Sequence, residues 1–209
     1  MTQAQSPRTQ DERSSAARRA LIGATIQVLA TEGYGRTTFT RIQKVAGVSR
    51  GLIGYHFGTK EALFEAVVHA IRDSSIDVAP SEARRETSGM QQLEEMVDLY
   101  IARLARDPKP AQTILTLTMH SVDDSPGILD AIQMRYQEMR DKIANCIRTG
   151  QRDGTIVDEV DPDALATVVQ GMLGGIAMQV VVDPQHLHID TVREAARTTL
   201  RSIATNAAS

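Results

Sequence analysis

The sequence predicts an all-α protein with a small N-terminal helix-turn-helix unit and a larger helical body. Three observations support this prediction. Apolar residues recur at intervals of three and four along most of the 209-residue chain, which is the spacing of one face of an α-helix. A strand-like pattern is confined to three consecutive valines at 180–182. Two short amphipathic segments joined by a glycine turn lie within 37–63, TTFTRIQKVAGVSRGLIGYHFGTKEAL.

The first short helix of this stretch is predicted to follow Thr38. A threonine oxygen at this position can accept a hydrogen bond from the free N–H groups of the first turn, so Thr38 is the expected cap. Ile42, Val45 and Ala46 fall at i, i+3 and i+4 and should form an apolar face that packs on the next helix. Gly47 is expected to end the helix, because glycine adopts the left-handed conformation that a Cβ would penalise.

A second short helix is predicted over 50–57, with Ser49 as its cap. Ile53 and Phe57 lie four residues apart and should pack on the first helix. A helix pair with a glycine turn and a polar, basic, partly aromatic outer face is typical of a helix-turn-helix whose second helix enters the major groove of DNA. The residues of that outer face are Arg50, Gly51, Tyr55 and His56.

The charge distribution agrees with a DNA-binding N-terminal part. Residues 8–72 contain 10 Lys+Arg and 5 Asp+Glu, a net charge of +5. Residues 73–209 contain 13 Lys+Arg and 21 Asp+Glu, a net charge of −8, and the two sum to the −3 of the chain. A basic segment on an acidic body is the electrostatic pattern expected of a protein that binds a polyanion through one end.

Residues 37–64 resemble the DNA-binding signature of the TetR family of transcriptional regulators. The match has no gaps, and the runs AGVS at 46–49, YHF at 55–57 and KE at 60–61 fall at the family's spacing. The resemblance implies that phosphate is contacted by Thr38, Thr40, Ser49, Tyr55, His56 and Lys60, and that Arg50, Gly51 and Leu52 lie nearest the base edges. Phosphate contacts position such a protein, whereas base-edge contacts specify the DNA sequence.

Two residues depart from the family pattern. Arg41 stands where the family often has an acidic residue that completes a capping box. Gly54 stands where the family commonly has a tyrosine that touches DNA. Glycine there removes one expected contact and costs about 1 kcal/mol of helix propensity relative to alanine.

Composition and resemblance together predict how the chain is divided. The segment 74–89 is rich in Ser, Pro and charge, which is typical of a connecting loop. We expect a flexible tail at 1–13, the helix-turn-helix DNA-binding domain at 14–73, the loop at 74–89, and a helical ligand-binding and dimerisation domain at 90–209. The remaining helices are predicted from Ser14 or Ser15 to Thr31 and over 59–76, 90–106, 110–122, 128–152, 162–182 and 190–204.

The helix predicted over 162–182 has no charged side chain from residue 164 onward and is long enough to span a bilayer. Its flanks are acidic, without the Lys/Arg bias or aromatic belt of a membrane span. We therefore expect it to be buried on one side in its own domain and on the other against a partner. The resemblance implies a homodimer with a four-helix interface, and the expected interface residues are Gly171, Gly174, Gly175 and Leu200.

The sequence gives no support for an enzyme, a metal site or a cofactor. His120 with Asp123 and Asp124, and the group at 183–190, lack the spacing of metal ligands, and surface loops explain both. No nucleophile motif or phosphate-binding loop is present. The polar first dozen residues lack the apolar core of a signal peptide, and a single cysteine, Cys146, suits a reducing cytoplasm.

The resemblance implies a repressor that binds a palindromic operator and is released when a small molecule in the body moves the 59–76 helix. The body has apolar, methionine-rich helix faces, so we expect a mainly apolar effector, neutral or cationic rather than anionic. An activator, or a DNA-binding protein without ligand control, are the alternatives. Polar groups for the ligand are sought among Tyr100, His120, Tyr136, Gln170 and Gln179, each of which has a core role as its alternative.

Overall fold

The computed structural model describes residues 10–49, 51–76, 87–121 and 125–205. Within these ranges the chain forms nine α-helices, one short 3-10 helix and no strand, which confirms the all-α prediction. The valines at 180–182 lie in a helix. The elements are α1 (Gln10–Glu32), η1 (Tyr34–Arg36), α2 (Phe39–Ala46), α3 (Leu52–Phe57), α4 (Lys60–Ile76), α5 (Gly89–Arg106), α6 (Lys109–Ser121), α7 (Pro126–Asp153), α8 (Pro162–Val182) and α9 (Ile189–Thr205).

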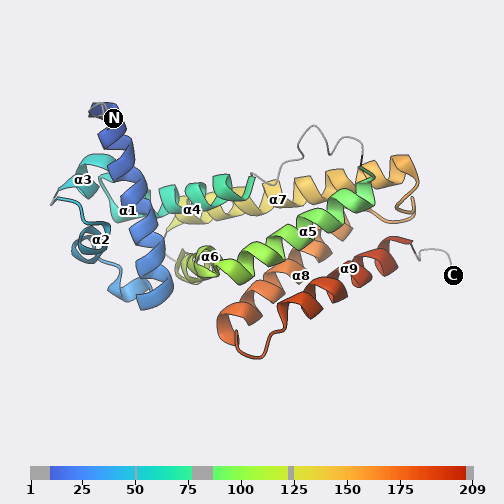
Figure 1. The fold of residues 1–209 in the computed structure, drawn as a ribbon. Coiled ribbons are helices and arrows are strands. Elements are labelled where there is room, and N and C mark those ends of the chain that lie inside the picture. Colours follow the sequence, from blue (N-terminus) through green and yellow to red (C-terminus); the bar gives the residue numbers. More distant parts are fainter. Residues whose placement is uncertain (1–9, 50, 77–86, 122–124, 206–209) are drawn as a thin grey trace, which may run out of the picture.

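The helices form a head and a body that share one long connection. Figure 1 shows α1, α2 and α3 gathered at one end of the molecule, with α4 leading away from them along α7. We call 10–76 the head and 87–205 the body. In the body α7 packs on α5 and α8, while α9 packs on α5. The head also rests on the body through contacts between α1 and α6.

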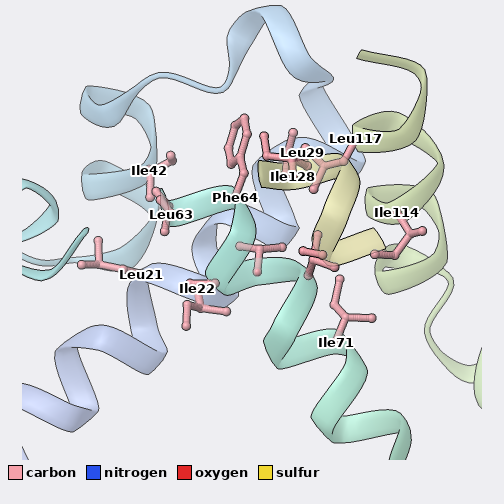
Figure 2. Close-up of a cluster of buried hydrophobic side chains, with 14 of the residues drawn as sticks. Leu21, Ile22, Leu29, Ile42, Leu63, Phe64, Ile71, Ile114, Leu117 and Ile128 are labelled. Carbon is pink, nitrogen blue, oxygen red and sulfur yellow. The ribbon is translucent and has the colours of Figure 1, made fainter. Parts of the chain in front are cut away.

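One apolar core extends from the head into the body. Phe64 and Leu63 of α4 are fully buried among residues of α1, α2 and α3. The same cluster continues into α6 and α7, and Figure 2 shows Leu117 and Ile128 close to Leu29. Because buried side chains in contact cannot move independently, a displacement of α4 must be felt at both ends of this cluster.

A second core holds the body helices together. Leu93, Ile143, Ile147 and Leu173 are almost fully buried within it, and they come from α5, α7 and α8. At one end of this core α5 approaches α7 so closely that a Cβ on Gly89 would lie 1.9 Å from the backbone nitrogen of Gly150.

Most helix ends agree with the sequence prediction within a few residues, and the N-terminal part of α1 differs most. Helix α1 is already formed at Gln10, the first described residue, and so extends beyond the predicted start at Ser14 or Ser15; Asp11 and Glu12 lie in this N-terminal part, where acidic side chains stabilise the positive end of the helix dipole. Helix α5 begins with a capping box in which Ser88 and Gln91 bond to each other's backbone N–H. The division into domains stays a prediction, and most of the 74–89 loop lies outside the described residues.

Helix α8 is, among the described residues, the one helix long and apolar enough to cross a membrane. One such helix is weak evidence for a membrane span, since core helices of water-soluble proteins share these properties. In its most apolar stretch 33% of the residues are buried inside the chain, through contacts with α7, α5 and α6. Much of α8 is therefore left uncovered by its own chain.

Candidate nucleic-acid interface

Helix α2 has the two ends that the sequence predicts. The backbone N–H of Arg41 donates to the Thr38 hydroxyl over 3.2 Å, so Thr38 caps the helix. Gly47 ends it in the left-handed conformation, with φ of 65°. Thr59 likewise caps α4, because its hydroxyl accepts a hydrogen bond from the Ala62 N–H at 3.1 Å. These helix ends thus depend on residues within one turn of each end.

Helix α3 begins later than predicted. It starts at Leu52, and its cap position is Gly51, which has φ of 97°. Ser49 is not the cap: its backbone oxygen, rather than its hydroxyl, accepts the Leu52 N–H at 3.4 Å. Gly51 takes a conformation that residues with a Cβ rarely adopt, and this turn shifts the helix start past Ser49. Arg50 lies outside the described residues.

The inner faces of the two helices differ in how closely they follow the prediction. Ile42 and Ile53 are fully buried, and Phe57 is half-buried against the same core. Val45 is 39% exposed, so its predicted place in the core is wrong. The other two residues of the predicted apolar face, Ile42 and Ala46, do contact the core, and their spacing of four residues turns Val45 outward.

The outer face presents polar groups to solvent. Tyr55 is 78% exposed, the larger exposure of the two large hydrophobic side chains that are exposed among the described residues of the head. Lys44, which the sequence analysis did not select, lies four residues after Thr40 and is exposed as Thr40 is; this spacing places both on one face of α2. The other exposed candidates are Thr38, Ser49 and Gly51, with Gly54 beside them.

Three of the residues predicted to contact DNA also make contacts within the head. Lys60 is half-buried, with its Nζ 4.6 Å from the ring centre of Tyr34, and burial lowers the pKa of its amine. Leu52 packs against the head core. His56 meets Tyr55 edge-on, with ring centres 5.0 Å apart, and its Nε2 is buried without a hydrogen-bond partner. Their contacts with DNA stay predictions.

Arg41 has a structural role at the position where it departs from the family pattern. Its guanidinium donates to both carboxylate oxygens of Glu32 over 2.6–2.9 Å. The hydrogen bond from Arg41 holds the pKa of the Glu32 carboxyl below its ordinary value. The pair joins α2 to the last residue of α1. A bond between two helices therefore takes the place of a capping box within α2.

Comparison with known proteins identifies the chain. The family described as "Bacterial regulatory proteins, tetR family" matches residues 21–67, which include the helix pair above. The family described as "BetI-type transcriptional repressor, C-terminal" matches residues 89–205, more than half of the chain. The protein belongs to the TetR family of transcriptional regulators. A TetR-family chain is a DNA-binding regulator and not an enzyme, so the resemblance seen in the sequence is confirmed.

Relatives support this assignment over most of their length. The regulator BetI 1 of Chromohalobacter salexigens is 26% identical over 188 residues, which cover 86% of each chain. The repressor BepR of Brucella suis is 23% identical over 161 residues, 76% of this chain and 77% of its own. A TetR-family regulator from Rhodococcus sp. has the same fold, with a TM-score of 0.77 at 21% identity, over 91% of this chain and all of the other.

The ligand candidates in the body of this TetR-family chain do not come together. Tyr100 lines a cavity of about 350 Å³ between α4, α5, α6 and α7, and the other four do not line it. His120 instead stacks on Tyr34 of the head. Gln170 is buried and donates to the backbone oxygen of Tyr136 at 3.2 Å, which is the core role given as its alternative. Gln179 is exposed on α8.

The expected dimer residues divide into two groups. A Cβ on Gly171, Gly174 or Gly175 would meet nothing within 4 Å, so this side of α8 is free in the single chain. Leu200 is 2% exposed and belongs to the body core, so its predicted place in the interface is wrong. The periodicity of α9 shows that Leu200 is on an apolar face, and packing on α5 decides that this face is turned inward.

Asp183, His186 and His188 are exposed in the segment between α8 and α9. Asp183 and His186 pair at 2.6 Å in an exposed loop, and no group of three possible metal ligands occurs among the described residues. Asp123 and Asp124 lie outside those residues. Cys146 is half-buried, and burial raises the pKa of its thiol to about 11, which suits a packed side chain.

Proposed function

We propose that this protein is a homodimeric repressor that binds a palindromic operator and leaves it when a small molecule occupies the cavity in the body. The position of α4 supports this proposal most directly. Its first half is buried in the head core through Leu63 and Phe64, while Ile71 and Ser74 in its second half line the cavity. A ligand that displaces the second half therefore acts on the helices that hold α3.

DNA binding is assigned to the outer face of α2 and α3. Exposure supports Thr38, Thr40, Ser49 and Tyr55 as phosphate contacts and adds Lys44 to them. Gly51 is exposed at the start of α3, where a glycine lets the backbone approach a base edge. The roles that the family resemblance implies are kept for four further residues. These are contact with phosphate for His56 and Lys60, and proximity to the base edges for Arg50 and Leu52.

Dimerisation is assigned to the uncovered face of α8. Val168, Met178 and Val182 are 58%, 46% and 72% exposed, and Gly171 and Gly175 are exposed between them. These five positions follow one another at intervals of three, four, three and four, which is the spacing of a seam between two helices. A symmetric contact of this face with its copy would bury the seam and would place two heads on a two-fold operator.

Ligand control requires a difference in ligand affinity between two states of the head. The ligand must bind more tightly to the state that cannot bind DNA, since a ligand with equal affinity for both shifts nothing. Arg103 of α5 donates to the backbone oxygen of Ser74 at 3.0 Å, close to the C-terminal end of α4. A ligand in the cavity can break or strengthen this bond. We place such a regulator in the cytoplasm, with its DNA.

Selection of binding sites from random duplex DNA tests the proposal. Purified full-length protein should enrich an inverted repeat, and a library of small molecules should contain compounds that release it. Enrichment of an inverted repeat without any releasing compound would leave a DNA-binding protein without ligand control. Retention of random duplexes without a shared sequence would contradict the regulator itself. Transcription from the selected operator in vitro then separates repression from activation.

A further inference from the structure

The cavity in the body has a charge opposite to that of the body as a whole. Four basic side chains line it, namely Arg103, Arg106, Arg135 and Lys142, against one acidic side chain, Asp107. Their difference is +3 at pH 7, although residues 73–209 carry −8. The acidity of the body therefore lies elsewhere, and the cavity itself is a basic site.

The single carboxylate does little to neutralise this site. Asp107 is exposed at the end of α5, and its Oδ1 accepts the backbone N–H of Lys109 at 3.2 Å. Arg106 is exposed beside it, at the rim. Arg103, Arg135 and Lys142 are half-buried, so the charge that faces the interior of the cavity is positive.

Arg135 on α7 is half-buried beside the ring of Tyr136, whose centre lies 5.8 Å from the guanidinium carbon of Arg135. Its Nε is buried and has no hydrogen-bond partner, and no ion pair joins it to a carboxylate of the described residues. Burying an N–H without an acceptor is costly. The positive charge of Arg135 acts on the hydroxyl of Tyr100, which lines the same cavity from α5. A carboxylate in the cavity would supply the acceptor that this buried N–H lacks.

Lys142 follows Arg135 by seven residues, two turns of the same helix, and lines the same cavity. Its nearby carboxylate, Glu138, is shared with Arg72, whose Nη1 lies 3.6 Å from Oε1. Burial lowers the pKa of the Lys142 amine, with Glu138 opposing this effect. Arg103 has only a neutral backbone oxygen as its partner. Arg135 and Lys142 thus place two cations on α7 near the one carboxylate of Glu138, whose Oε1 pairs with Arg72 and whose Oε2 is buried without a partner.

The rest of the lining is aliphatic and sulfur-containing. Met96 and Leu104 of α5, Met139 of α7 and Ile71 of α4 supply this surface. A volume of about 350 Å³ is at the small end of ligand cavities in proteins. Flexible methionines adapt to an aliphatic chain. Among the described residues that line the cavity, Tyr100 is the one with an aromatic ring, so the lining suits an aliphatic chain better than a stacked aromatic ligand.

We propose that the cavity binds an amphipathic monocarboxylate, with its carboxylate at Arg135 and Lys142 and its aliphatic chain against Met96, Leu104 and Met139. Arginine matches a carboxylate through two parallel N–H donors, and such charge-assisted bonds are the strong ones. This inference rests on the proposed function, because it names the ligand class of the same cavity. It reverses the neutral or cationic preference drawn from the sequence, in which the charge of this cavity was not visible.

Calorimetric titration of the full-length protein without DNA tests the ligand class. The probes are decanoate, 1-decanol and decyltrimethylammonium, which share a ten-carbon chain and differ in the charge of the head group. Decanoate should bind about tenfold or more tightly than 1-decanol, because one charge-assisted contact has this value, and the ammonium should not bind. Arg135→Gln and Lys142→Met should each weaken decanoate binding and leave binding of 1-decanol unchanged. Arg152→Gln, an exposed arginine of α7 outside the cavity, is the control.

The outcomes separate the ligand class from the proposed function. Equal binding of decanoate and 1-decanol, absence of decanoate binding, or indifference of decanoate binding to both cavity variants would overturn the anion site. Decanoate binding without any effect on operator affinity would support the anion site and contradict ligand control. Release of the operator by a neutral or cationic compound, together with absent decanoate binding, would support ligand control and overturn the anion class.

Discussion

The ring of Tyr34 in the head stacks on the ring of His120 in the body, with centres 4.3 Å apart and planes 7° from parallel. The Nζ of Lys60 lies 4.6 Å from the centre of the same tyrosine ring and 5.3 Å from that of Phe64. Lys60 is the first residue of α4, so these contacts join η1, α4 and α6 beside the core that head and body share.

Loss of this stack should weaken the attachment of head to body. His120→Ala is expected to lower the free energy of unfolding by about 0.5–1.5 kcal/mol, the usual value of an aromatic pair. Urea denaturation measures this change. Met119→Ala is the matched control, because Met119 is the neighbouring residue of α6 and is 69% exposed. An equal effect of the two substitutions would show that the stack contributes nothing of its own.

The crossing of α5 and α7 gives a second prediction. Gly89→Ala would place a methyl group 1.9 Å from the Gly150 nitrogen and 2.5 Å from the Cys146 oxygen. Because backbone atoms cannot yield as side chains do, the free energy of unfolding should fall by about 1–3 kcal/mol or more. Thermal unfolding measures it. Gly23→Ala in α1 is the control. A Cβ at this exposed position meets nothing within 4 Å, so the free energy of unfolding should rise by about 1 kcal/mol through the higher helix propensity of alanine.

The Glu32–Arg41 pair predicts a pH dependence of stability. Hydrogen bonding to Arg41 lowers the pKa of the Glu32 carboxyl in the folded chain from its ordinary value of 4.5. The unfolded chain therefore binds the proton more readily, so the pair stabilises the fold above pH 4.5 and loses its effect as the pH falls through the lowered value. Urea denaturation between pH 6 and 3 should show that the free energy of unfolding of the wild type approaches that of Glu32→Gln at the acidic end of the range. If the free energies of unfolding of the wild type and of Glu32→Gln differed by the same amount at every pH in this range, the predicted stabilisation by the ion pair would be wrong.

A further prediction concerns Lys44 on the outer face of α2. If Lys44 contacts a phosphate, Lys44→Ala should weaken operator and random DNA alike, and should reduce the slope of log affinity against log salt by about one. Arg152→Ala, an exposed arginine of the body, should leave the slope unchanged. Fluorescence anisotropy at several salt concentrations measures both. A changed preference between DNA sequences, with the slope preserved, would place Lys44 at a base edge.

Local signals in the sequence were sufficient for a large part of this structure. Thr38 and Gly47 predict the two ends of α2 because a cap depends on residues within one turn. The helix over 162–182 begins directly after Asp161, whose side chain accepts the Ala164 N–H, and it continues along an uninterrupted apolar stretch. The AGVS and YHF runs predict the family, and the family matches confirm it.

Features that depend on distant residues were not predictable in this way. Arg41 lies nine residues from Glu32, and the bond between them exists because α1 and α2 cross. The basic charge of the cavity comes from α5 and α7, whose residues are separated in the sequence among many acidic ones. The inward orientation of Leu200 depends on the packing of α9 against α5.

The uncovered seam of α8 predicts a dimer that Gly175→Arg should disrupt. A Cβ on Gly175 meets nothing within 4 Å in the single chain, so the substitution should leave the fold of the protomer intact. In the proposed dimer it would place two arginines in the centre of an apolar seam, where unpaired charges are costly. Sedimentation should show a monomer with an unchanged helical circular-dichroism spectrum. A variant that sediments as a dimer would place the interface elsewhere.

The two-fold reading of DNA is tested most directly by anisotropy titrations on the selected operator and on a version with one half-site scrambled. The wild-type protein should bind the intact operator about a thousandfold or more tightly than the half-scrambled one, since one head then contributes only non-specific binding. Gly175→Arg should bind both duplexes at the weaker level. Equal affinity of the wild-type protein for the intact and half-scrambled operators would contradict a homodimer that reads a palindrome.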